Sequence, residues 1–571
     1  MTWLRPPAPR TALAVLAGLL WALAFPSFQI PMLAWIAPGM LLLTGLGVRV
    51  GEAARLGYLA GLVHHLTALY WLLNIPFAVG NVAGWFALSA YCALFPAIWL
   101  GLAIATAPRP DSPSDSSAAA RSRSTRFGND PFALGSAPIK LRGSTWDALR
   151  EVLCTSGPRR QAWLVMCALS WVGLEFFRGW FLSGFPWNFL GASQYELIPL
   201  IQIASVAGVH GVSFIVAWVS LAMAAAAATV ILRPQLRFAW KNELAPALIA
   251  LLLLIAWGVV KTTRPRPTSD RLATLALVQP SIPQTLIFDP ASVTNRFSQL
   301  LELTRTAITH RPDAIIWPEA SLPALTSEAF EQLRTLIREA DIPIVFGADD
   351  AAPGTSGRYD LYNAAFLFNG DGQFVARYRK QRLVIFGEYT PGVRWLPFLA
   401  DWSPAGIGFS TGVGPTTFYL ETIAAHVAPN ICFEDNFTDL VRAQVEPDTD
   451  FVLNLTNNGW FGESAAQWQH AANAVFRAVE NNVPLVRCTN NGLTCWIDEQ
   501  GRLRQIFKDE SGSVYGSGVA VFQVPLLQAG TVREQTFFSR FGDWFGWLCL
   551  AAVGLTARRT YLRHRKQAAG K

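Results

Sequence analysis

Eight long apolar stretches limit what this 571-residue chain can fold into. Most of them reach the roughly 20 residues that a helix needs to cross a lipid bilayer. A backbone inside lipid must satisfy its polar groups internally, so the stretches predict a polytopic α-helical membrane domain with about eight spans. The stretches lie at about 11–26, 30–48, 55–77, 81–106, 161–178, 198–232, 244–261 and 542–557.

The composition agrees with a membrane protein. Apolar residues make up 52% of the chain and charged residues only 15%, whereas ordinary soluble domains carry roughly 25% charge. The first stretch follows Arg5 and Arg10 but has no small-residue cleavage site, so we expect a retained helix rather than a signal peptide. Seven scattered cysteines do not form the pattern of a disulfide framework.

Positively charged residues predict the orientation, because Lys and Arg accumulate in cytoplasmic loops. They gather at 49–55, 109–160, 233–241 and 558–566. This pattern predicts cytoplasmic N- and C-termini and a large extracytoplasmic segment. It also accounts for much of the net charge of +7, so we expect no nucleic-acid partner.

These observations divide the chain into three parts. Residues 1–261 are predicted to form the membrane domain, with about seven helices and a polar, disordered cytoplasmic loop at 108–160. Residues 262–541 are predicted to form the extracytoplasmic domain. Residues 542–571 are expected to supply the last helix and a basic tail.

The extracytoplasmic segment has the pattern of an α/β domain. Apolar residues recur at helical spacing from Phe297 to Ile308, and short β-branched runs lie before and after this stretch. Alternating helices and strands predict a layered α/β fold. The predicted strands are Leu272–Val278, Ala314–Trp317, Ile342–Phe346, Phe451–Leu455 and Val483–Cys488.

Unusual polar residues follow some of these runs. Glu319 follows Trp317-Pro318, and Cys432 follows the apolar stretch that ends at Ile431. Functional groups of α/β folds tend to lie at the carboxyl ends of strands. A lone cysteine is usually a buried structural residue, but a nucleophilic one needs a base or a cation nearby. Glu319 and Lys380 are candidates for these two roles.

In their order and spacing, Glu319, Lys380 and Cys432 resemble the Glu-Lys-Cys triad of the carbon–nitrogen hydrolase, or nitrilase, superfamily. The rest of the chain resembles one membrane branch of it, the bacterial apolipoprotein N-acyltransferase family. The segments that carry this second resemblance are Leu23-Ala24-Phe25-Pro26, Trp171…Glu175…Arg178-Gly179-Trp180, Ser183-Gly184-Phe185-Pro186-Trp187-Asn188, Gly208-Val209-His210-Gly211 and Trp460-Phe461-Gly462…Trp468-Gln469-His470.

The resemblance implies an α-β-β-α sandwich for the extramembrane domain and a ping-pong acyl transfer. An acyl chain would pass from a membrane phospholipid to Cys432 as a thioester, and then to the α-amine of a diacylated apolipoprotein. Glu319 would be the general base and Lys380 the support for the oxyanion. The backbone N–H of Phe433 would be a second oxyanion donor. We expect no metal and no redox cofactor.

The same resemblance gives Glu388 and Glu434 supporting roles beside the triad. Candidate substrate or lid residues are Phe288, Trp460, Phe461, Trp187 and Asn188. Three positions depart from the family pattern: Phe288 stands where Trp is usual, Ile385 where Pro is usual, and Phe433 where Tyr is frequent. These departures leave the triad intact but lose polar groups near it.

Other interpretations remain at this point. The same triad could serve a membrane-tethered amidase or nitrilase that hydrolyses a small C–N substrate, or the domain could be an inactive part of a membrane scaffold or transporter. The segment Gly408-Phe409-Ser410-Thr411-Gly412 matches the serine-hydrolase motif G-x-S-x-G. That motif requires a following helix, which Val413-Gly414-Pro415 opposes.

Overall fold

A computed structural model of the chain describes most of its residues. The described ranges are 8–26, 28–77, 80–108, 152, 155, 157–232, 238, 240–264, 269–287, 289–322, 327–354, 359–393, 395–396, 398 and 408–569. Most of the loop expected at 108–160, and Phe288, lie outside the described residues.

A helical region comprises residues 8–263 and 544–569 of the described chain, and each of the eight apolar stretches contains helix. Three helices, α4, α9 and α10, are long and apolar enough to cross a membrane. The span count of about eight therefore stays a prediction. The main elements are α1 (Ala8–Leu23), η1 (Pro31–Trp35), α2 (Ala37–Gly45), α3 (Val50–Ala68), η2 (Tyr70–Asn74), α4 (Gly80–Ala105), α7 (Gly157–Arg178), α8 (Ile198–Ile201), α9 (Ala204–Leu232), α10 (Trp240–Thr263) and α17 (Trp544–Ala569).

Two six-stranded sheets form the centre of the second part, as the alternation of the sequence predicted. The first sheet has the order β12-β1-β2-β3-β4-β5, and the second has the order β11-β10-β9-β8-β7-β6. The strands are β1 (Leu272–Gln279), β2 (Ala314–Ile316), β3 (Ile344–Pro353), β4 (Tyr359–Phe368), β5 (Phe374–Arg379), β6 (Phe418–Leu420), β7 (Ala425–Ile431), β8 (Thr449–Thr456), β9 (Leu485–Thr489), β10 (Cys495–Ile497), β11 (Leu503–Ile506) and β12 (Gly518–Pro525).

The five predicted strands are all present, with shifted ends. The predicted strand Ile342–Phe346 begins two residues later, at Ile344, and continues to Pro353. The predicted helix around Phe297 is α12. The helices and short turns of this part are α11 (Gln284–Ile287), α12 (Val293–Thr309), α13 (Ser327–Ala340), η9 (Cys432–Asn436), α14 (Thr438–Gln444), η10 (Asn458–Phe461), α15 (Ala466–Asn481) and α16 (Phe537–Phe541).

The sheets and helices stack as an α-β-β-α sandwich, which confirms the predicted fold class. Side chains alternate between the two faces of a strand: Leu275 and Leu277 face the second sheet, whereas Ala276 and Val278 face α12 and α13. On the far side of the second sheet, Val452 packs in the core that includes α14 and α15.

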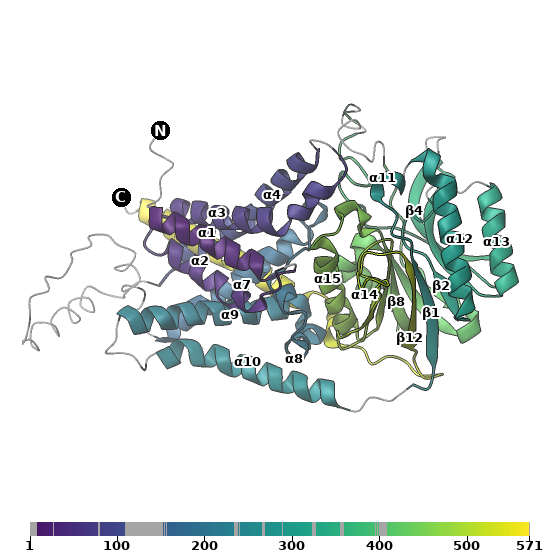
Figure 1. The fold of residues 1–571 in the computed structure, drawn as a ribbon. Coiled ribbons are helices and arrows are strands. Elements are labelled where there is room, and N and C mark those ends of the chain that lie inside the picture. The colour runs from purple at the N-terminus through teal and green to yellow at the C-terminus, as the bar shows by residue number, and fades with distance from the viewer. Residues whose placement is uncertain are drawn as a thin grey trace, which may run out of the picture.

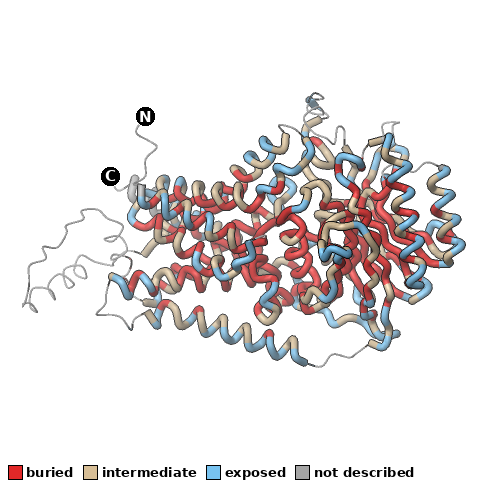
Figure 2. Tube along the Cα trace, in the orientation of Figure 1, coloured by how far each residue is buried: buried red, intermediate tan, exposed pale blue. Residues whose placement is uncertain are grey.

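Helix α15 lies between the second sheet and the helical region (Figure 1). Val475 and Val479 of α15 belong to the same hydrophobic core as the buried residues of α1, α7 and α9. Burial is continuous from the sheets through α15 into the helices (Figure 2). The sandwich and the helical region therefore share a packed interface rather than a flexible tether.

Candidate active site

The three predicted triad residues each follow the end of a strand. Glu319 lies in the turn after β2, Lys380 directly follows β5, and Cys432 directly follows β7. Strands β2 and β5 belong to the first sheet, and β7 belongs to the second. The site therefore forms where strand ends of the two sheets meet.

Lys380 is buried between two carboxylates. Its Nζ donates to Oε1 of Glu319 at 2.9 Å and to Oε1 of Glu388 at 2.8 Å. Its side chain is only 1% exposed. Burial alone would lower the pKa of Lys380, but the attraction of Glu319 and Glu388 outweighs burial and raises the pKa well above its usual value. Lys380 is therefore a fixed cation.

Asn363, which the sequence analysis did not single out, completes this arrangement. Its Nδ2 donates to Oε1 of Glu319 and to Oε1 of Glu388, at 2.8 Å in both cases. Asn363 lies in β4, in register with Asp349 of β3. A polar residue inside a strand gives no distinctive sequence signal, because either face of the strand could hold it.

The second oxygen of Glu319 is held by the end of β8. The backbone N–H of Asn457 donates to Oε2 of Glu319 at 2.9 Å. The Asn457 side chain donates to Oε1 of Gln284 at 2.9 Å and accepts from Asn490 at 3.0 Å. Glu319 thus accepts three hydrogen bonds and has a fixed orientation. Neither Asn457 nor Gln284 was predicted as a site residue.

Cys432 has a strained backbone, with a φ of 52°. Such left-handed geometry is uncommon for residues other than glycine and occurs often at functional sites. Burial and the charge of Glu319 raise the pKa of the Cys432 thiol to about 12, although Lys380 and the Thr456 side chain act in the opposite direction. The resting cysteine is therefore a thiol that needs a base.

Glu434 ties the segment after Lys380 to the segment after Cys432. Its Oε1 accepts from the backbone N–H groups of Gln381 at 2.6 Å and Arg382 at 3.1 Å. Its Oε2 accepts from the backbone N–H of Ile431 at 2.8 Å and from the Tyr378 hydroxyl at 2.9 Å. Burial raises the pKa of Glu434 to about 7, against the effect of these hydrogen bonds and of Lys380.

An aromatic wall includes Phe433, the residue after Cys432. We use this term for Trp71, Trp187, Phe433 and Phe461, which belong to one hydrophobic cluster. The ring centres of Trp187 and Phe433 are 6.2 Å apart, those of Trp71 and Trp187 are 5.3 Å apart, and those of Trp71 and Phe461 are 4.5 Å apart. The helical region supplies the two tryptophans, and the sandwich supplies the two phenylalanines.

The remaining predicted residues have different surroundings. Asn188 is buried beside Trp187, and its Nδ2 donates to Gln469 at 3.2 Å. Trp460 is partly exposed in η10, next to Phe461. Ser410 of the G-x-S-x-G match is followed by irregular chain up to β6, without the helix that a nucleophile elbow needs.

A charged cluster lies next to the turn that begins at Cys432. His470 Nε2 donates to Oδ1 of Asp435 at 2.7 Å, and Arg487 donates to the other carboxylate oxygen. Burial would raise the pKa of Asp435, but His470 and Arg487 outweigh it and lower this pKa. The other ring nitrogen of His470, Nδ1, lies 3.2 Å from Oδ1 of Asn458, and Asp435 belongs to η9, the turn that begins at Cys432. The cluster thus fixes the turn that presents the thiol.

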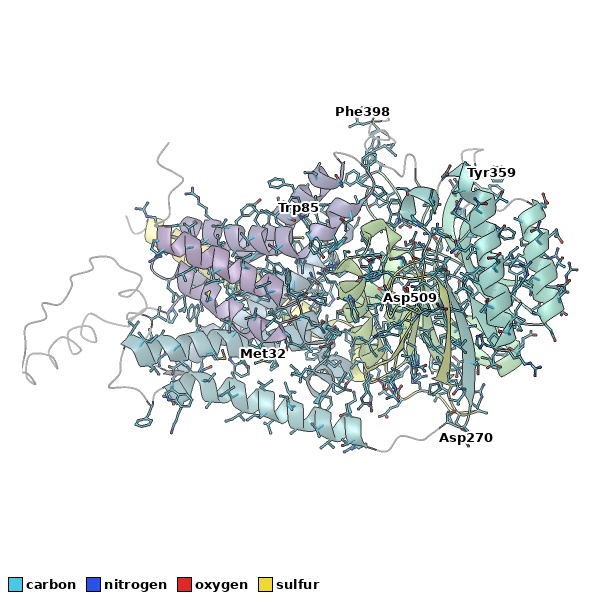
Figure 3. All side chains as sticks on the ribbon, viewed as in Figure 1. Met32, Trp85, Asp270, Tyr359, Phe398 and Asp509 are labelled. Carbon is cyan, nitrogen blue, oxygen red and sulfur yellow. The ribbon has the colours of Figure 1, made fainter. Side chains whose placement is uncertain are left out.

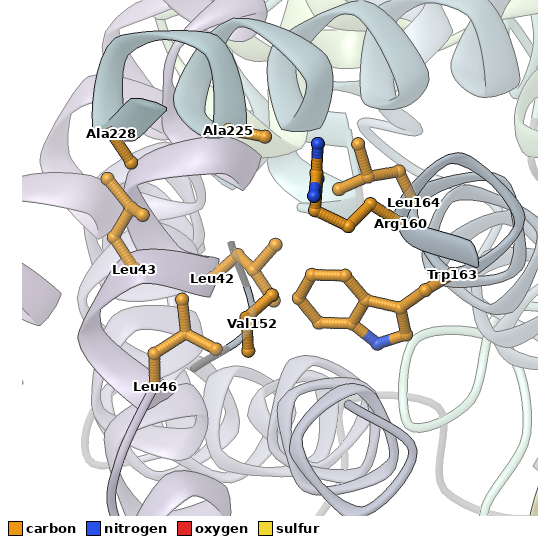
Figure 4. A pocket seen from close by; sticks show the side chains of 9 residues that line it. All are labelled: Leu42, Leu43, Leu46, Val152, Arg160, Trp163, Leu164, Ala225 and Ala228. Atoms are coloured by element: carbon orange, nitrogen blue, oxygen red, sulfur yellow. The ribbon is translucent and has the colours of Figure 1, made fainter. Parts of the chain in front are cut away.

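In the described chain, two cavities lie in the helical region. One has an empty volume of about 340 Å³ and is lined by leucines of α2, alanines of α9, and Arg160 and Trp163 of α7 (Figure 4). The other, of about 300 Å³, lies between α1, α3, α4 and α7. Side chains fill the sandwich itself densely (Figure 3).

Comparison with known proteins covers both parts of the chain. Residues 17–123 and 131–222 match the apolipoprotein N-acyltransferase N-terminal domain, and residues 274–522 match carbon-nitrogen hydrolase. A solved amidase from Nesterenkonia sp. is 17% identical and covers 46% of this chain and 93% of its own, with a TM-score of 0.33.

Two relatives extend over most of the chain. The apolipoprotein N-acyltransferase of Rickettsia prowazekii is 27% identical, over 86% of this chain and 86% of the relative. The apolipoprotein N-acyltransferase of Geobacter metallireducens is 32% identical, over 96% of this chain and 95% of the relative. At this identity over nearly the full length of both proteins, the chain belongs to the apolipoprotein N-acyltransferase family.

Proposed function

We propose that this protein transfers an acyl chain from a membrane phospholipid to the α-amine of an S-diacylglyceryl-cysteine at the N-terminus of lipoproteins, through a thioester on Cys432. Its family membership makes it a membrane acyltransferase. The observation that carries the chemical proposal is the set of Glu319, Glu388 and the buried Lys380 between them, at the strand ends where Cys432 begins its strained turn.

The first half-reaction forms the thioester. Glu319 accepts the proton of the Cys432 thiol, and the thiolate attacks the carbonyl carbon of the phospholipid ester. A C–S bond forms and the ester C–O bond breaks. The leaving alkoxide of the lysophospholipid takes the proton back from Glu319. A base is needed here because the thiol pKa of about 12 leaves little thiolate at neutral pH.

The second half-reaction moves the acyl chain to the acceptor. The neutral α-amine of the diacylated apolipoprotein attacks the thioester carbonyl, an N–C bond forms, and the C–S bond breaks. Glu319 takes the proton that the attacking nitrogen loses and returns it to the departing Cys432 thiolate. The enzyme then regains its starting state with no net proton change.

Lys380 and the backbone N–H of Phe433 are the proposed donors to the oxyanion of both tetrahedral intermediates. Lys380 suits this role because Glu319 and Glu388 hold its Nζ in place before substrate arrives. Glu388 keeps Lys380 protonated and oriented, and Glu434 keeps the segments of Lys380 and Cys432 together. These supporting roles require no contact with substrate.

The aromatic wall supports a lipid rather than a small amide as acyl donor. Trp71 and Trp187 of the helical region meet Phe433 and Phe461 of the sandwich beside the nucleophile. Apolar walls suit a long acyl chain and exclude water from the thioester. A small-amide hydrolase needs water as acceptor, and its substrate has no acyl chain long enough to contact an apolar wall shared with the membrane region.

The proposed topology places both termini in the cytoplasm and residues 262–541 on the periplasmic side of the inner membrane, with 1–261 and 542–571 contributing the membrane helices. The start of α1 and the end of α17 lie at the same end of the helical region, the end away from the sheets (Figure 1). This arrangement supports termini on one side of the membrane and chemistry on the other.

Mass spectrometry of the purified protein tests the proposal. Incubated with phospholipid, the wild type is expected to gain one acyl mass on Cys432 and to lose it to a diacylated lipopeptide with a free N-terminus. Cys432→Ala should do neither, whereas the matched control Cys495→Ala, which removes another buried cysteine, should do both. A folded wild type that gains no acyl mass from phospholipid would contradict the proposal and favour the small-amide hydrolase.

A further inference from the structure

One side chain of α15, Gln469, joins four segments of the helical region. Its Oε1 accepts from the indole N–H of Trp71 at 3.1 Å, from that of Trp187 at 2.8 Å and from Asn188 Nδ2 at 3.2 Å. Its Nε2 donates to the backbone carbonyls of Pro26 at 2.6 Å and Ala68 at 3.1 Å. Both polar atoms of the amide are thus used, and the side chain is buried.

These partners come from separate parts of the sequence. Pro26 follows α1, Ala68 ends α3, Trp71 lies in η2, and Trp187 and Asn188 belong to the segment after α7. Gln469 is more than 280 residues away from each of them. One amide therefore determines how these segments meet the sandwich.

The next residue on α15 reaches the turn that contains Cys432. His470 donates to Asp435 in η9, which begins at Cys432. Consecutive side chains of a helix point about 100° apart, so Gln469 can reach the helical region while His470 reaches η9. Two neighbouring residues thus connect the ends of the membrane helices to the turn that presents the thiol.

The amide oxygen of Gln469 also positions the aromatic wall. Both indole N–H groups of Trp71 and Trp187 point to this single atom, which fixes one ring relative to the other. Trp187 in turn stacks near Phe433, directly after Cys432. Losing the acceptor would leave two buried indole N–H groups unpaired, which costs free energy and favours a different ring arrangement.

We propose that Gln469 is a positioning residue that sets the aromatic wall against Cys432 and so governs the use of long-chain membrane donors. This inference rests on the proposed function and adds a specificity determinant to it. Gln469 does not touch the triad, so its loss should impair the reaction with a bilayer phospholipid far more than the reaction with a short, soluble ester.

Gln202 offers a matched control at the same interface. This buried glutamine follows α8, and its Nε2 donates to the carbonyl of Gln500 in the sandwich at 2.9 Å and to that of Ile198 at 3.0 Å. It joins the helical region to the sandwich without contacting the aromatic wall or the nucleophile turn. Gln202→Leu should therefore weaken the interface without changing donor preference.

The experiment compares Cys432 acylation by phospholipid vesicles and by p-nitrophenyl acetate in wild type, Gln469→Leu and Gln202→Leu, with thermal midpoints measured alongside. We expect the ratio of the two rate constants to fall at least about tenfold in Gln469→Leu, as for loss of a buried hydrogen-bond partner, and to stay near the wild-type ratio in Gln202→Leu. Equal loss with both donors, or no loss with either, would overturn the inference.

A second variant keeps the test decisive if Gln469→Leu does not fold. Gln469→Glu retains an acceptor for both tryptophans but places a carboxylate against the carbonyls of Pro26 and Ala68. Protonation lets the new carboxyl group donate again, so the vesicle-to-ester ratio of the variant, relative to wild type at the same pH, should rise as the pH falls. If this relative ratio does not change with pH, the inference is overturned. A wild type that reacts with the ester but not with vesicles would instead refute the proposed function.

Discussion

Asn363 and Lys380 donate hydrogen bonds to the same two carboxylate oxygens, Oε1 of Glu319 and Oε1 of Glu388. Two carboxylates this close would repel each other, and one lysine supplies a single compensating charge. The neutral amide of Asn363 adds two donors without a second cation. The cluster thus keeps a net negative charge, which suits Glu319 for accepting the thiol proton.

Replacing Asn363 by Ala is expected to lower the rate of Cys432 acylation by about 10- to 100-fold, the range that corresponds to the loss of a hydrogen-bond donor to a charged group. Asn363→Asp should be worse, because it adds a third carboxylate. Acyl-enzyme formation followed by mass spectrometry measures the effect. Asn369→Ala, just beyond β4, serves as the control. If Asn363→Ala is acylated at the wild-type rate, Asn363 plays no part in the reaction.

The raised pKa of Cys432 predicts an unusual pH dependence of alkylation. The alkylation rate constant of a free cysteine levels off once the pH exceeds the thiol pKa of about 8.5. The Cys432 pKa of about 12 means that the thiolate fraction, and hence the rate constant with iodoacetamide, should keep rising beyond that point. Glu319→Gln removes a charge that raises this pKa. We therefore expect the variant to be alkylated faster near pH 9 while losing acyl transfer.

Peptide mapping that reports only the Cys432 peptide keeps other cysteines out of this measurement. Glu388→Gln provides a comparison, because Glu388 contributes less to the raised pKa than Glu319 does. Slower alkylation of Glu319→Gln than of wild type at every pH would contradict the assigned effect of Glu319 on the thiol pKa.

Part of this site could be predicted from the sequence. Glu319 and Cys432 carry functional groups after apolar runs, and Lys380 stands between them at the spacing of a known triad, so their chemistry and place in the chain were visible together. Asn363 could not be found in the same way, because its partners come from two distant turns and its strand position is unremarkable. Asn457 acts on Glu319 through a backbone N–H, which leaves no trace in residue identity.

The fold shows a similar division. Short apolar, β-branched runs predicted the strands, because a strand that is buried on both faces is apolar at successive positions. The role of Gln469 could not be read from the motif Trp468-Gln469-His470, since its five partners come together only in the tertiary structure. Helix α9 likewise read as one apolar run, although its backbone breaks at Gly208.

Glu434 should influence stability through its four hydrogen bonds. In Glu434→Gln one side-chain oxygen becomes an NH₂ group that faces N–H or O–H donors, so we expect a loss of about 1–3 kcal/mol in the free energy of unfolding. The wild-type pKa of about 7 lies above the usual carboxyl value. The native state therefore binds this proton more readily, and its contribution to stability rises as the pH falls below about 7.

Thermal midpoints in detergent between about pH 5 and pH 8 check this prediction, because that interval covers the shifted carboxyl titration. Glu434→Gln should lack the wild-type component that rises toward low pH. Glu446→Gln changes an exposed glutamate of the same part of the chain and should retain it. If the wild-type midpoint falls steadily from pH 8 to pH 5 and Glu434→Gln shows the same slope, the raised pKa of Glu434 does not contribute to stability as predicted.

Gly208 marks the place where α9 meets the sandwich. Its φ of 65° and ψ of −174° are accessible to glycine but rarely to other residues. A Cβ there would lie 2.8 Å from the Phe538 ring, and the next residue, Val209, donates its N–H to Oε1 of Glu480 at 2.9 Å. Gly208→Ala should therefore cost about 1–3 kcal/mol in unfolding free energy through backbone strain, plus the clash.

Thermal unfolding of Gly208→Ala, Phe538→Ala and the double variant separates strain from clash. Removing the ring relieves only the contact, so the two changes together should cost less than the sum of the single costs, while backbone strain remains. Gly84→Ala is the control, because nothing lies within 4 Å of a Cβ at that position of α4 and alanine favours helix. A Gly208→Ala midpoint equal to that of Gly84→Ala would show that the break in α9 is not needed for docking.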